Sequence, residues 1–312
     1  MIRILQGDCT ESLKTLEDGS INTCITSPPY WGLRNYNDES KQLGMEDTPE
    51  EFTENLVKVF REIKRVLRDD GTVWLNLGDS YSSGGRTTTT NQSLRGDKEY
   101  GVTRPKPSKG IKPKDLIGIP WRVAFALQAD GWYLRQDIIW HKPNPMPESV
   151  RDRCTKSHEY IFLLSKNVKY YYDHEAIKED SKFPNGPTAA HAIRKGSEDP
   201  LMHTRAGLHK VGPLAKRNKR SVWTITTKPF KGAHFATFPK DLIEPCVLAG
   251  CPEGGTVLDP FGGSGTTGIV AAGHNRNAVL LELNAEYIEL AKARIEKDMG
   301  MFVDLTVETN DD

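Results

Sequence analysis

The segment from residue 255 to Glu282 restricts the fold more than any other part of the chain. Residues 255–259 have the pattern of a short buried strand, and a G-x-G-x-x-G run from Gly263 to Gly268 separates this strand from a helix of small residues. A second strand, residues 278–281, leads to Glu282 about 20 residues after Gly263, the distance at which a carboxylate reaches a ribose diol. The segment therefore predicts a β-α-β unit that binds an adenosyl group.

The same pattern is a fingerprint of dinucleotide binding, so an NAD-binding oxidoreductase is one alternative. Only about 50 residues follow Gly263, which is too few for the second half of a dinucleotide-binding domain. An adenosyl ligand without a pyrophosphate needs only one β-α-β half, and S-adenosylmethionine meets that requirement. A glycine-rich tight turn without any ligand is the remaining, purely structural interpretation.

A second constrained stretch, Ser27-Pro28-Pro29-Tyr30, lies near the beginning of the chain. It follows residues 21–26, whose apolar content predicts a buried strand. Each proline fixes its own φ and keeps the preceding residue extended, so the chain leaves the strand as a stiff segment. This segment offers a hydroxyl, carbonyl oxygens and an aromatic ring, which suit a flat ligand that carries an NH₂ group, such as a nucleobase. A proline turn in front of core aromatics is the alternative.

Helical and strand patterns alternate along the rest of the chain. Thr48-Pro49 followed by Glu51 predicts a well-capped helix, and Thr10 is the predicted N-cap of a shorter one. Further strands are predicted at 2–6, 72–77, 133–140 and 160–164, and further helices at 10–16, 120–129, 239–248 and 285–297. The alternation predicts an α/β fold around a mostly parallel sheet. Residues 80–115 interrupt it as a mobile loop, and residues 167–230 interrupt it as an insertion.

Charge is balanced overall but segregated along the sequence. Lys+Arg and Asp+Glu both number 42, yet residues 205–231 contain Lys and Arg but no Asp or Glu. Such a block predicts local phosphate contact, although a solvated loop fits it equally well. Five cysteines without a CxxC pair predict neither a metal site nor a disulfide framework. Because there is no apolar run of membrane-spanning length and no signal-peptide pattern, a cytoplasmic protein without a membrane partner is expected.

Together these segments resemble the DNA amino-methyltransferases that act on exocyclic amines, in the circularly permuted group whose catalytic motif precedes the cofactor motif. The resemblance covers nearly the whole chain apart from the loop at 80–115 and the basic insertion. Residues 27–30 match the catalytic (S/D/N)-P-P-(Y/F), and residues 259–266 match the D-P-F-x-G-S-G-T cofactor loop. Residues 234–239 match the segment that closes over the methionine end of the cofactor. Glu282 matches the ribose acid, and Asp8 matches an early cofactor contact.

The resemblance implies a Rossmann-like, seven-stranded S-adenosylmethionine-dependent methyltransferase sheet with an inserted target-recognition region. Residues 1–166 would form the catalytic part, 167–231 the target-recognition region and 232–312 the cofactor-binding part. The implied catalytic residues are Ser27, Pro28, Pro29 and Tyr30. The implied cofactor contacts are Asp8, Thr237, Phe238, Asp259, Pro260, Phe261, Gly263, Ser264, Gly265, Thr266 and Glu282. The expected DNA contacts are Lys216, Arg217, Lys219 and Arg220 in the basic insertion. Lys142 and Asn144 are expected to contact the DNA by lining the base pocket from the opposite strand end, with a turn that has no such function as the alternative for Asn144-Pro145.

Other residues receive structural expectations. His158-Glu159 resembles a family signature ahead of a strand, and a structural hydrogen bond is its expected role. Trp223 fits either a feature of target-recognition segments or a core tryptophan. Cys246 and Cys251 are expected to be core thiols.

The implied reaction is methyl transfer from S-adenosylmethionine to an exocyclic amine of a base that is flipped out of double-stranded DNA. The Ser27 side chain and the Pro28 carbonyl would hold the amine hydrogens, and Tyr30 would stack on the base. Serine at the first motif position favours N4 of cytosine, with adenine N6 as the alternative. A DNA-binding module without catalysis would need neither the glycine loop nor Glu282. The sequence leaves open a cognate restriction endonuclease partner and the choice between monomer and homodimer.

Overall fold

The computed structural model describes residues 1–32, 43–82, 111–181, 215–227, 238–300 and 303–309. The chain divides into two compact units, Met1–Tyr172 with Ser221–Asp312 and, separately, Asp173–Arg220. The first unit is a sheet with helices on both faces. In the second unit, the short strands β6 (Glu179–Asp180) and β7 (Lys216–Arg217) pair antiparallel. None of the described helices is long and apolar enough to cross a membrane.

Within the described residues, nine strands form the sheet of the first unit, in the order β11-β1-β10-β9-β2-β3-β5-β4-β8. Their bounds are β1 Ile2–Gln6, β2 Ile21–Thr26, β3 Leu67–Leu77, β4 Tyr133–His141, β5 His158–Ser165, β8 Val222–Thr224, β9 Thr256–Asp259, β10 Asn277–Glu282 and β11 Leu305–Thr309. All neighbouring strands are parallel except that β5 runs antiparallel to both β3 and β4. The central seven strands are the sheet that the family resemblance implies, and β11 and β8 each extend it at one edge.

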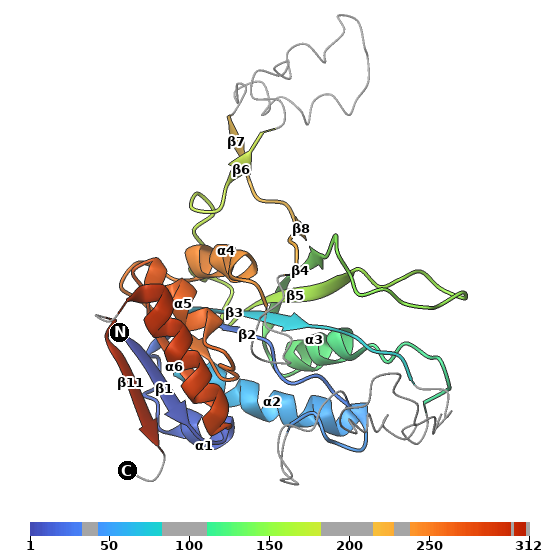
Figure 1. The fold of residues 1–312 in the computed structure, drawn as a ribbon, viewed down its shortest axis with the longest axis horizontal. Coiled ribbons are helices and arrows are strands. Elements are labelled where there is room, and N and C mark those ends of the chain that lie inside the picture. The colour runs from blue at the N-terminus through green and yellow to red at the C-terminus, as the bar shows by residue number, and fades with distance from the viewer. Residues whose placement is uncertain (33–42, 83–110, 182–214, 228–237, 301–302, 310–312) are drawn as a thin grey trace, which may run out of the picture. The chain divides into compact units, whose positions relative to one another are not determined.

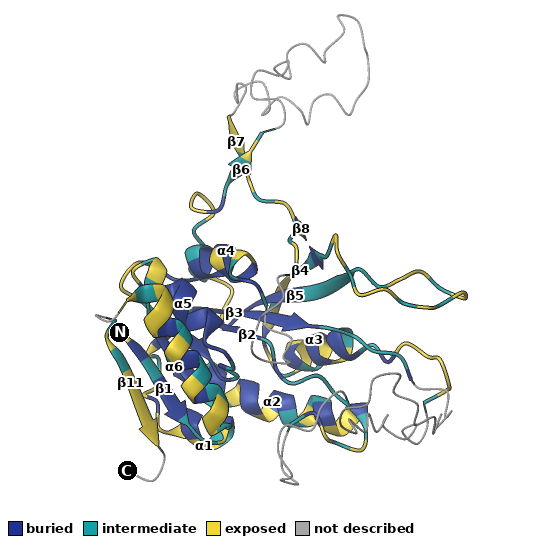
Figure 2. Ribbon diagram, viewed as in Figure 1, coloured by how far each residue is buried: buried dark blue, intermediate teal, exposed yellow. Residues whose placement is uncertain are grey.

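Helices cover both faces of this sheet (Figure 1). α1 (Cys9–Lys14), α2 (Pro49–Val66) and α3 (Ile119–Ala129) pack together on one face. α4 (Lys240–Gly250), α5 (Thr266–Gly273) and α6 (Ala285–Met299) pack on the other face. The inner positions of β2 and β10 are buried in succession, as expected for strands with helices on both sides. Figure 2 shows the contrast with β11, which is mostly exposed at the edge.

The helix α2 confirms its prediction closely. Thr48 caps it by accepting a hydrogen bond from the Glu51 N–H at 3.1 Å, and Pro49 occupies the first turn. Phe52 and Phe60, from its apolar stripe, are fully buried. Cap, proline and stripe all lie within one short segment, so no distant contact had to be known to predict this helix.

Three other predictions were wrong in detail. The first helix is capped by Asp8, whose side chain accepts from the N–H groups of Thr10 at 2.9 Å and Glu11 at 3.3 Å, so Thr10 is not the cap. β3 begins at Leu67, earlier than predicted, because the chain already pairs with β2 at Ile21. β11 was not predicted at all, because it pairs only with β1 and buries little of its own surface.

The two predicted irregular regions are only partly described. Residues 83–110, most of the predicted loop, and residues 182–214, most of the insertion, lie outside the described residues. The two ends of the loop meet, since the Ser82 N–H donates to the Asp115 carbonyl at 2.8 Å. β8 falls within the predicted insertion but pairs with β4, with Trp223 opposite Trp140. The end of the insertion therefore belongs to the main sheet.

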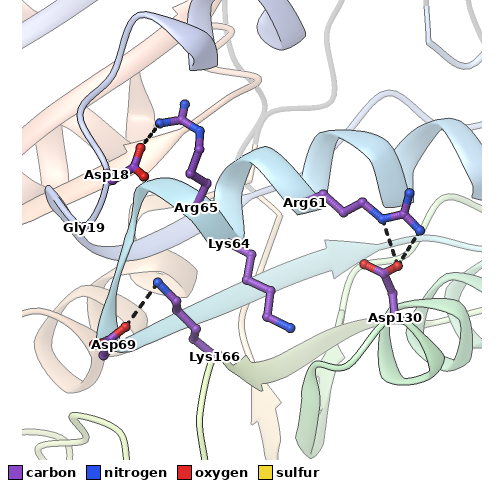
Figure 3. A pocket seen from close by; sticks show the side chains of 8 residues that line it. All are labelled: Asp18, Gly19, Arg61, Lys64, Arg65, Asp69, Asp130 and Lys166. Atoms are coloured by element: carbon purple, nitrogen blue, oxygen red, sulfur yellow. Dashed lines mark hydrogen bonds and ion pairs between the residues drawn. The ribbon is translucent and has the colours of Figure 1, made fainter.

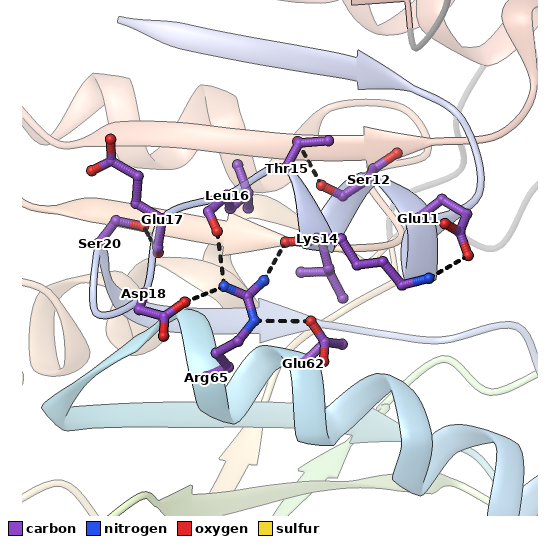
Figure 4. A network of polar contacts seen from close by, with 11 residues as sticks. Glu11, Ser12, Lys14, Thr15, Leu16, Glu17, Asp18, Ser20, Glu62 and Arg65 are labelled. Atoms are coloured by element: carbon purple, nitrogen blue, oxygen red, sulfur yellow. Dashed lines mark hydrogen bonds and ion pairs between the residues drawn. The ribbon is translucent and has the colours of Figure 1, made fainter.

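The amino ends of β2 and β3 carry a network of charged side chains (Figure 4). Arg65 of α2 donates to the carbonyls of Leu13 and Leu16 at 2.7 and 3.0 Å, to Glu62 at 2.9 Å and also to Asp18. A surface hollow of about 660 Å³ lies beside it (Figure 3), lined by Asp18, Gly19, Arg61, Lys64, Arg65, Asp69, Asp130 and Lys166. Arg65 thus fixes the connection between α1 and β2 on α2. This charged hollow lies where β2 and β3 begin, at the opposite end of these strands from the predicted motifs.

Candidate active site

The carboxyl ends of four neighbouring strands bring the predicted motifs together on one side of the sheet, where these strands end. In sheet order, β1 leads to Asp8, β10 ends at Glu282, β9 leads to residues 260–266 and β2 leads to residues 27–30. At the junction of β2 and β9, Thr26 Oγ1 donates to Asp259 Oδ1 at 2.6 Å in a buried position. These two residues are 233 positions apart in sequence. Ligands of open α/β sheets bind at such strand ends, so this edge is the candidate site.

Asp259 organises the glycine loop. Its Oδ1 also accepts the Phe261 N–H at 3.2 Å, and its Oδ2 accepts Thr267 Oγ1 at 2.6 Å. Burial raises the pKa of this carboxyl to about 6, while the hydrogen bonds from Thr26, Thr267 and Phe261 act in the opposite direction. Both carboxylate oxygens are engaged by protein donors, so Asp259 shapes the loop. Direct contact of its side chain with the cofactor stays a prediction.

Glycine is required at specific positions of this loop. Gly263 and Gly265 have φ values of +50° and +75°, which residues with a side chain rarely adopt. The space beside Gly263 is open, since a Cβ there would find only the Phe261 carbonyl oxygen, at 3.8 Å. A Cβ at Gly268 would lie 3.1 Å from Leu280 Cδ1, so this glycine lets α5 pack closely on β10. The loop thereby presents open backbone beside the start of α5, which fits an adenosyl ligand.

Glu282 lies beside the loop with its carboxylate fixed by backbone donors. Oε2 accepts the Gly263 N–H at 2.8 Å, and Oε1 accepts the Asn284 N–H at 2.9 Å. Burial raises the pKa of this carboxyl, and the two hydrogen bonds oppose that shift. Each carboxylate oxygen has a second lone pair, which suits the two hydroxyls of a ribose. Asp8 follows on the adjoining strand end, where the Gly7 N–H donates to the Glu282 carbonyl at 3.0 Å.

Arg294 of α6, which was not among the predicted site residues, holds the loop from outside. Its Nη1 donates to the Ser264 carbonyl at 2.7 Å, to Ser264 Oγ at 2.6 Å and to Thr266 Oγ1 at 3.0 Å. Burial lowers the pKa of this guanidinium. The hydroxyls of Ser264 and Thr266 therefore face α6, and a contact of either residue with the cofactor stays a prediction. A basic residue on an amphipathic helix gives no local signal of such a role.

Tyr30, on the other side of Asp259, is held at both its hydroxyl and its ring. Its Oη donates to Glu159 Oε2 at 2.8 Å, and a Cβ at Gly78 would lie 2.6 Å from Tyr30 Cε2. Burial raises the pKa of Tyr30 well above its usual range, and Glu159 raises it further, while Ser27 and the Gly78 backbone oppose the shift. The hydroxyl therefore stays protonated and donates to Glu159, and stacking of a base on the ring stays a prediction.

Glu159, predicted to make only a structural hydrogen bond, belongs to the same group of strand ends. Besides the Tyr30 hydroxyl, it accepts Asn76 Nδ2 at 3.1 Å and pairs with the ammonium of Lys142. The expected structural hydrogen bond is present, but it connects Glu159 directly to the Ser-Pro-Pro-Tyr motif. This placement depends on β5 being antiparallel, because only then does its amino end reach the edge where the other strands end.

The two predicted residues after β4 differ in their surroundings. Lys142 is mostly buried, and besides Glu159 its ammonium lies 4.2 Å from the centroid of the Trp140 ring. Asn144 exchanges two hydrogen bonds with the backbone of Thr227, at 3.0 and 3.1 Å. Lys142 is thus part of the strand-end cluster, whereas Asn144 joins two loops. A contact of either residue with DNA stays a prediction.

Residues predicted near α4 and β8 are partly described. Phe238 is half-buried just before α4, whereas Thr237 and residues 234–236 of the closing segment lie outside the described residues. Trp223 is buried, and its ring centroid lies 6.4 Å from that of Trp74, which confirms the core alternative. Cys246 and Cys251 are likewise buried, as expected of core thiols.

Four predicted DNA contacts lie in the second unit. Arg217 and Arg220 both donate to Glu179 Oε1, at 2.9 and 2.7 Å. Lys216 is exposed on β7, and Lys219 is partly buried. Because two guanidinium groups share one carboxylate, this group of side chains keeps a positive charge. Its contact with DNA stays a prediction.

Comparison with known proteins identifies the family of this α/β domain. The N6_N4_Mtase family model, described as DNA methylase, matches residues 21–293. The chain is 51% identical to the Type II methyltransferase M.SmaI of Serratia marcescens over 94% of this chain and 90% of that protein. It is 47% identical to the Type II methyltransferase M.Cfr9I of Citrobacter freundii over 94% of this chain and 87% of that protein. The chain belongs to this DNA methylase family.

Solved structures share the fold. A putative DNA modification methylase from Thermus thermophilus, complexed with S-adenosyl-L-methionine, aligns over 99% of both chains with a TM-score of 0.64 and 23% identity. The cytosine-N4-specific PvuII DNA methyltransferase aligns over 98% of this chain and 94% of its own, with a TM-score of 0.62 and 17% identity. The predicted fold and family are confirmed, and with them S-adenosylmethionine as the family's cofactor. The protein is a DNA methyltransferase, which removes the oxidoreductase and the non-catalytic alternatives.

Proposed function

We propose that this enzyme transfers a methyl group from S-adenosylmethionine to N4 of a cytosine that is extruded from double-stranded DNA. The observation that carries the proposal is the buried hydrogen bond between Thr26 and Asp259, which holds the Ser27 segment and the glycine loop on neighbouring strand ends. A methyl donor at the loop and an amine at Ser27 then meet at one edge of the sheet. Adenine N6 is the second candidate, because the family model includes both specificities.

The residues on the loop side fit the cofactor. Glu282, oriented by the N–H groups of Gly263 and Asn284, accepts the ribose hydroxyls. The open backbone at Gly263 leaves room for the adenosyl group. When bound, S-adenosylmethionine supplies an electrophilic methyl group on its sulfonium. Asp259 and Arg294 hold the loop in shape from its two sides and need not touch the ligand.

The residues at the end of β2 fit the amine. The lone pair of an exocyclic amine is delocalised into the base, which makes the nitrogen a poor nucleophile. The Ser27 hydroxyl and the Pro28 carbonyl accept its two hydrogens, draw the nitrogen towards tetrahedral geometry and aim its lone pair. The following proline has no N–H and keeps the segment stiff. Positioning and charge stabilisation of this kind supply most of the catalysis.

The side chain at position 27 favours cytosine over adenine. A serine hydroxyl both accepts and donates, so it can also meet the acceptor N3 that neighbours N4 in cytosine. A carboxylate at this position could only accept. Ser27 therefore matches the hydrogen-bonding edge of cytosine next to its amine.

The target amine is out of reach inside a duplex, so the base has to leave the stack at a cost of a few kcal/mol. Stacking of the base on the Tyr30 ring offsets about 1–3 kcal/mol of that cost. Lys216, Arg217, Lys219 and Arg220 provide positive charge for phosphates. Binding through such contacts weakens steeply as salt is raised.

The relatives named above are Type II methyltransferases, which favours a role beside a cognate restriction endonuclease. In that role, methylation protects the sites that the nuclease would cut. DNA that this enzyme has methylated should resist a nuclease that reads the same sequence, and unmethylated DNA should be cut. Cleavage of both DNAs by every nuclease encoded beside the enzyme would remove this part of the proposal.

One experiment tests the reaction and the base together. The enzyme is incubated with labelled S-adenosylmethionine and mixed-sequence duplex DNA, and the DNA is digested to nucleosides for mass spectrometry. The expected product is N4-methylcytosine. N6-methyladenine as the product would replace the proposed base with the second candidate, and label on neither base would overturn the proposal.

A further inference from the structure

The direction of β5 places a carboxylate in the base half of the site, which is the group of strand ends around Ser27 and Tyr30. The cofactor half is the group around the glycine loop, Glu282 and Asp8. β5 is antiparallel to β3 and β4, so its second residue, Glu159, lies at the edge where β2, β3 and β4 end. Its side chain is only 15% exposed. A carboxylate in such a position needs donors for both of its oxygens.

The donors come from three other strand ends. Oε2 accepts Tyr30 Oη at 2.8 Å and Asn76 Nδ2 at 3.1 Å, and Oε1 pairs with the ammonium of Lys142. Tyr30 follows β2, Asn76 lies in β3 and Lys142 follows β4. Asn76 is fixed in turn, since its Nδ2 also donates to the Tyr160 carbonyl at 3.1 Å. One carboxylate thus connects the ends of all the strands that surround the proposed base pocket.

These contacts leave the Tyr30 ring with little freedom. Glu159 holds the hydroxyl, and Gly78 is packed so closely that a Cβ there would lie 2.6 Å from the ring atom Cε2. The ring is therefore presented in one orientation. Lys142 is fixed similarly, between Glu159 and the face of Trp140, whose centroid is 4.2 Å from its ammonium.

We propose that Glu159 is the positioning residue of the base pocket, acting through Tyr30 and Lys142. It fixes the ring on which the extruded base stacks, and it fixes the Lys142 ammonium at the same group of strand ends. The inference rests on the proposed methyl transfer but holds for a cytosine or an adenine, because either base can stack on the Tyr30 ring. A carboxylate that only stabilised the sheet would have no influence on turnover through Tyr30.

The first test is a double-variant cycle on kcat, with DNA and cofactor saturating. Glu159→Gln should lower kcat about 10–100-fold, the range for a lost charge-assisted hydrogen bond. Tyr30→Phe, which keeps the ring but loses the hydroxyl, should lower it by less. The double variant should be about as slow as Glu159→Gln alone, because Glu159 acts partly through that hydroxyl. Effects that multiply would overturn the proposal.

A matched control and a readout of binding accompany this cycle. Glu148→Gln also breaks an ion pair of a half-buried carboxylate, with Arg153, in the same connection between β4 and β5, and should leave kcat unchanged. The affinity of Glu159→Gln for S-adenosylmethionine should equal that of the wild type, because Glu282 and the glycine loop are untouched. Loss of cofactor affinity together with kcat would indicate a merely structural role and overturn the proposal.

The second test separates stability from positioning. Glu159→Gln leaves the Lys142 ammonium buried without its counter-ion, so Tm should fall. Adding Lys142→Met removes that unpaired charge, so Tm should recover while kcat stays low. Recovery of kcat together with Tm would overturn the proposal. If the wild-type enzyme methylates adenine N6, the cytosine assignment fails while the same cycle still decides the role of Glu159.

Discussion

The cofactor half and the base half of this site are built from contacts of very different range. In the cofactor half, Glu282 binds Gly263, 19 residues away, and Asp259 binds Thr267, 8 residues away. In the base half, Tyr30 binds Glu159 across 129 residues, and Asn76 binds it across 83. Apart from Asp8 at the end of β1, the cofactor half is a local β-α-β unit, whereas the base half forms only when four strands have assembled.

This difference in contact range predicts that mutations in the two halves change different kinetic quantities. Changes in the cofactor half should act on cofactor affinity, because its residues are fixed by their own segment. Changes in the base half should act on turnover, because its residues aim the amine. The Thr26–Asp259 hydrogen bond is the direct connection between them and belongs to both.

The largest effect is expected from Ser27→Ala in the base half. Loss of one positioned partner of the reacting group should lower kcat about 100–1000-fold, as for oxyanion-hole donors. Calorimetry should find cofactor affinity nearly unchanged. Ser20→Ala, at an exposed serine before β2, is the control and should have no effect. A parallel loss of cofactor affinity would contradict the separation of the two halves.

The contribution of Asp259, at the junction between the halves, to folding stability should depend on pH. Burial raises the pKa of Asp259 from 3.8 to about 6, so its ionised form destabilises the folded state, by about 3 kcal/mol above pH 6. The folded carboxyl binds its proton more tightly than the unfolded one, so this contribution to stability is lost as pH rises from about 4 to 6.

Asp259→Asn isolates that contribution because asparagine does not titrate. Urea unfolding of both proteins without cofactor should show the wild type losing about 2 kcal/mol relative to the variant between pH 4 and pH 7. A difference that stays constant with pH would show that Asp259 titrates normally. It would also remove the destabilisation assigned to the ionised Asp259 carboxyl.

In the cofactor half, Glu282→Gln should weaken S-adenosylmethionine binding about 10–100-fold, because hydrogen bonds to a charged group contribute about 1.5–3 kcal/mol. At saturating cofactor, kcat should change only a few-fold. Glu289→Gln, on the exposed face of α6, serves as the control. A large loss of kcat with unchanged cofactor affinity would show that Glu282 acts on turnover and not on cofactor binding.

The smallest effect is expected from Arg294→Lys. The lysine side chain is one bond shorter, so its ammonium would not reach the oxygens of Ser264 and Thr266 that Nη1 now binds, and the glycine loop should loosen. Cofactor affinity should fall about 5-fold, or about 1 kcal/mol, with a small decrease in Tm. Arg68→Lys, at an exposed ion pair with Asp70, provides the matched control. Unchanged affinity would show that α6 does not support the loop.

The two halves also differed in how well the sequence predicted them. Gly263, Gly265 and Glu282 could be assigned because a glycine bend and a spaced acid are local signals, and the structure gives both glycines positive φ. Arg294 could not be assigned, because nothing in its own helix shows that its guanidinium reaches the loop. Local patterns predict a residue's conformation more readily than its distant partners.

The base half illustrates the same limit more strongly. The stiff Ser-Pro-Pro-Tyr segment was evident from its prolines, but Glu159 was assigned only a structural hydrogen bond. Its role depends on β5 entering the sheet antiparallel between β3 and β4. Strand order and direction are set by the packing of the whole sheet, so no window of sequence around Glu159 contains that information.

By itself the sequence determined the α/β class, the capped helix α2, the glycine bend and the stiffness of the Ser-Pro-Pro-Tyr segment. These depend on backbone restrictions and periodicity within single segments. Only the tertiary structure decided that Thr26 would bond Asp259 and that Glu159 would join three other strand ends at Tyr30. Such contacts are fixed by which strands become neighbours, and that choice is made by burial of the whole core.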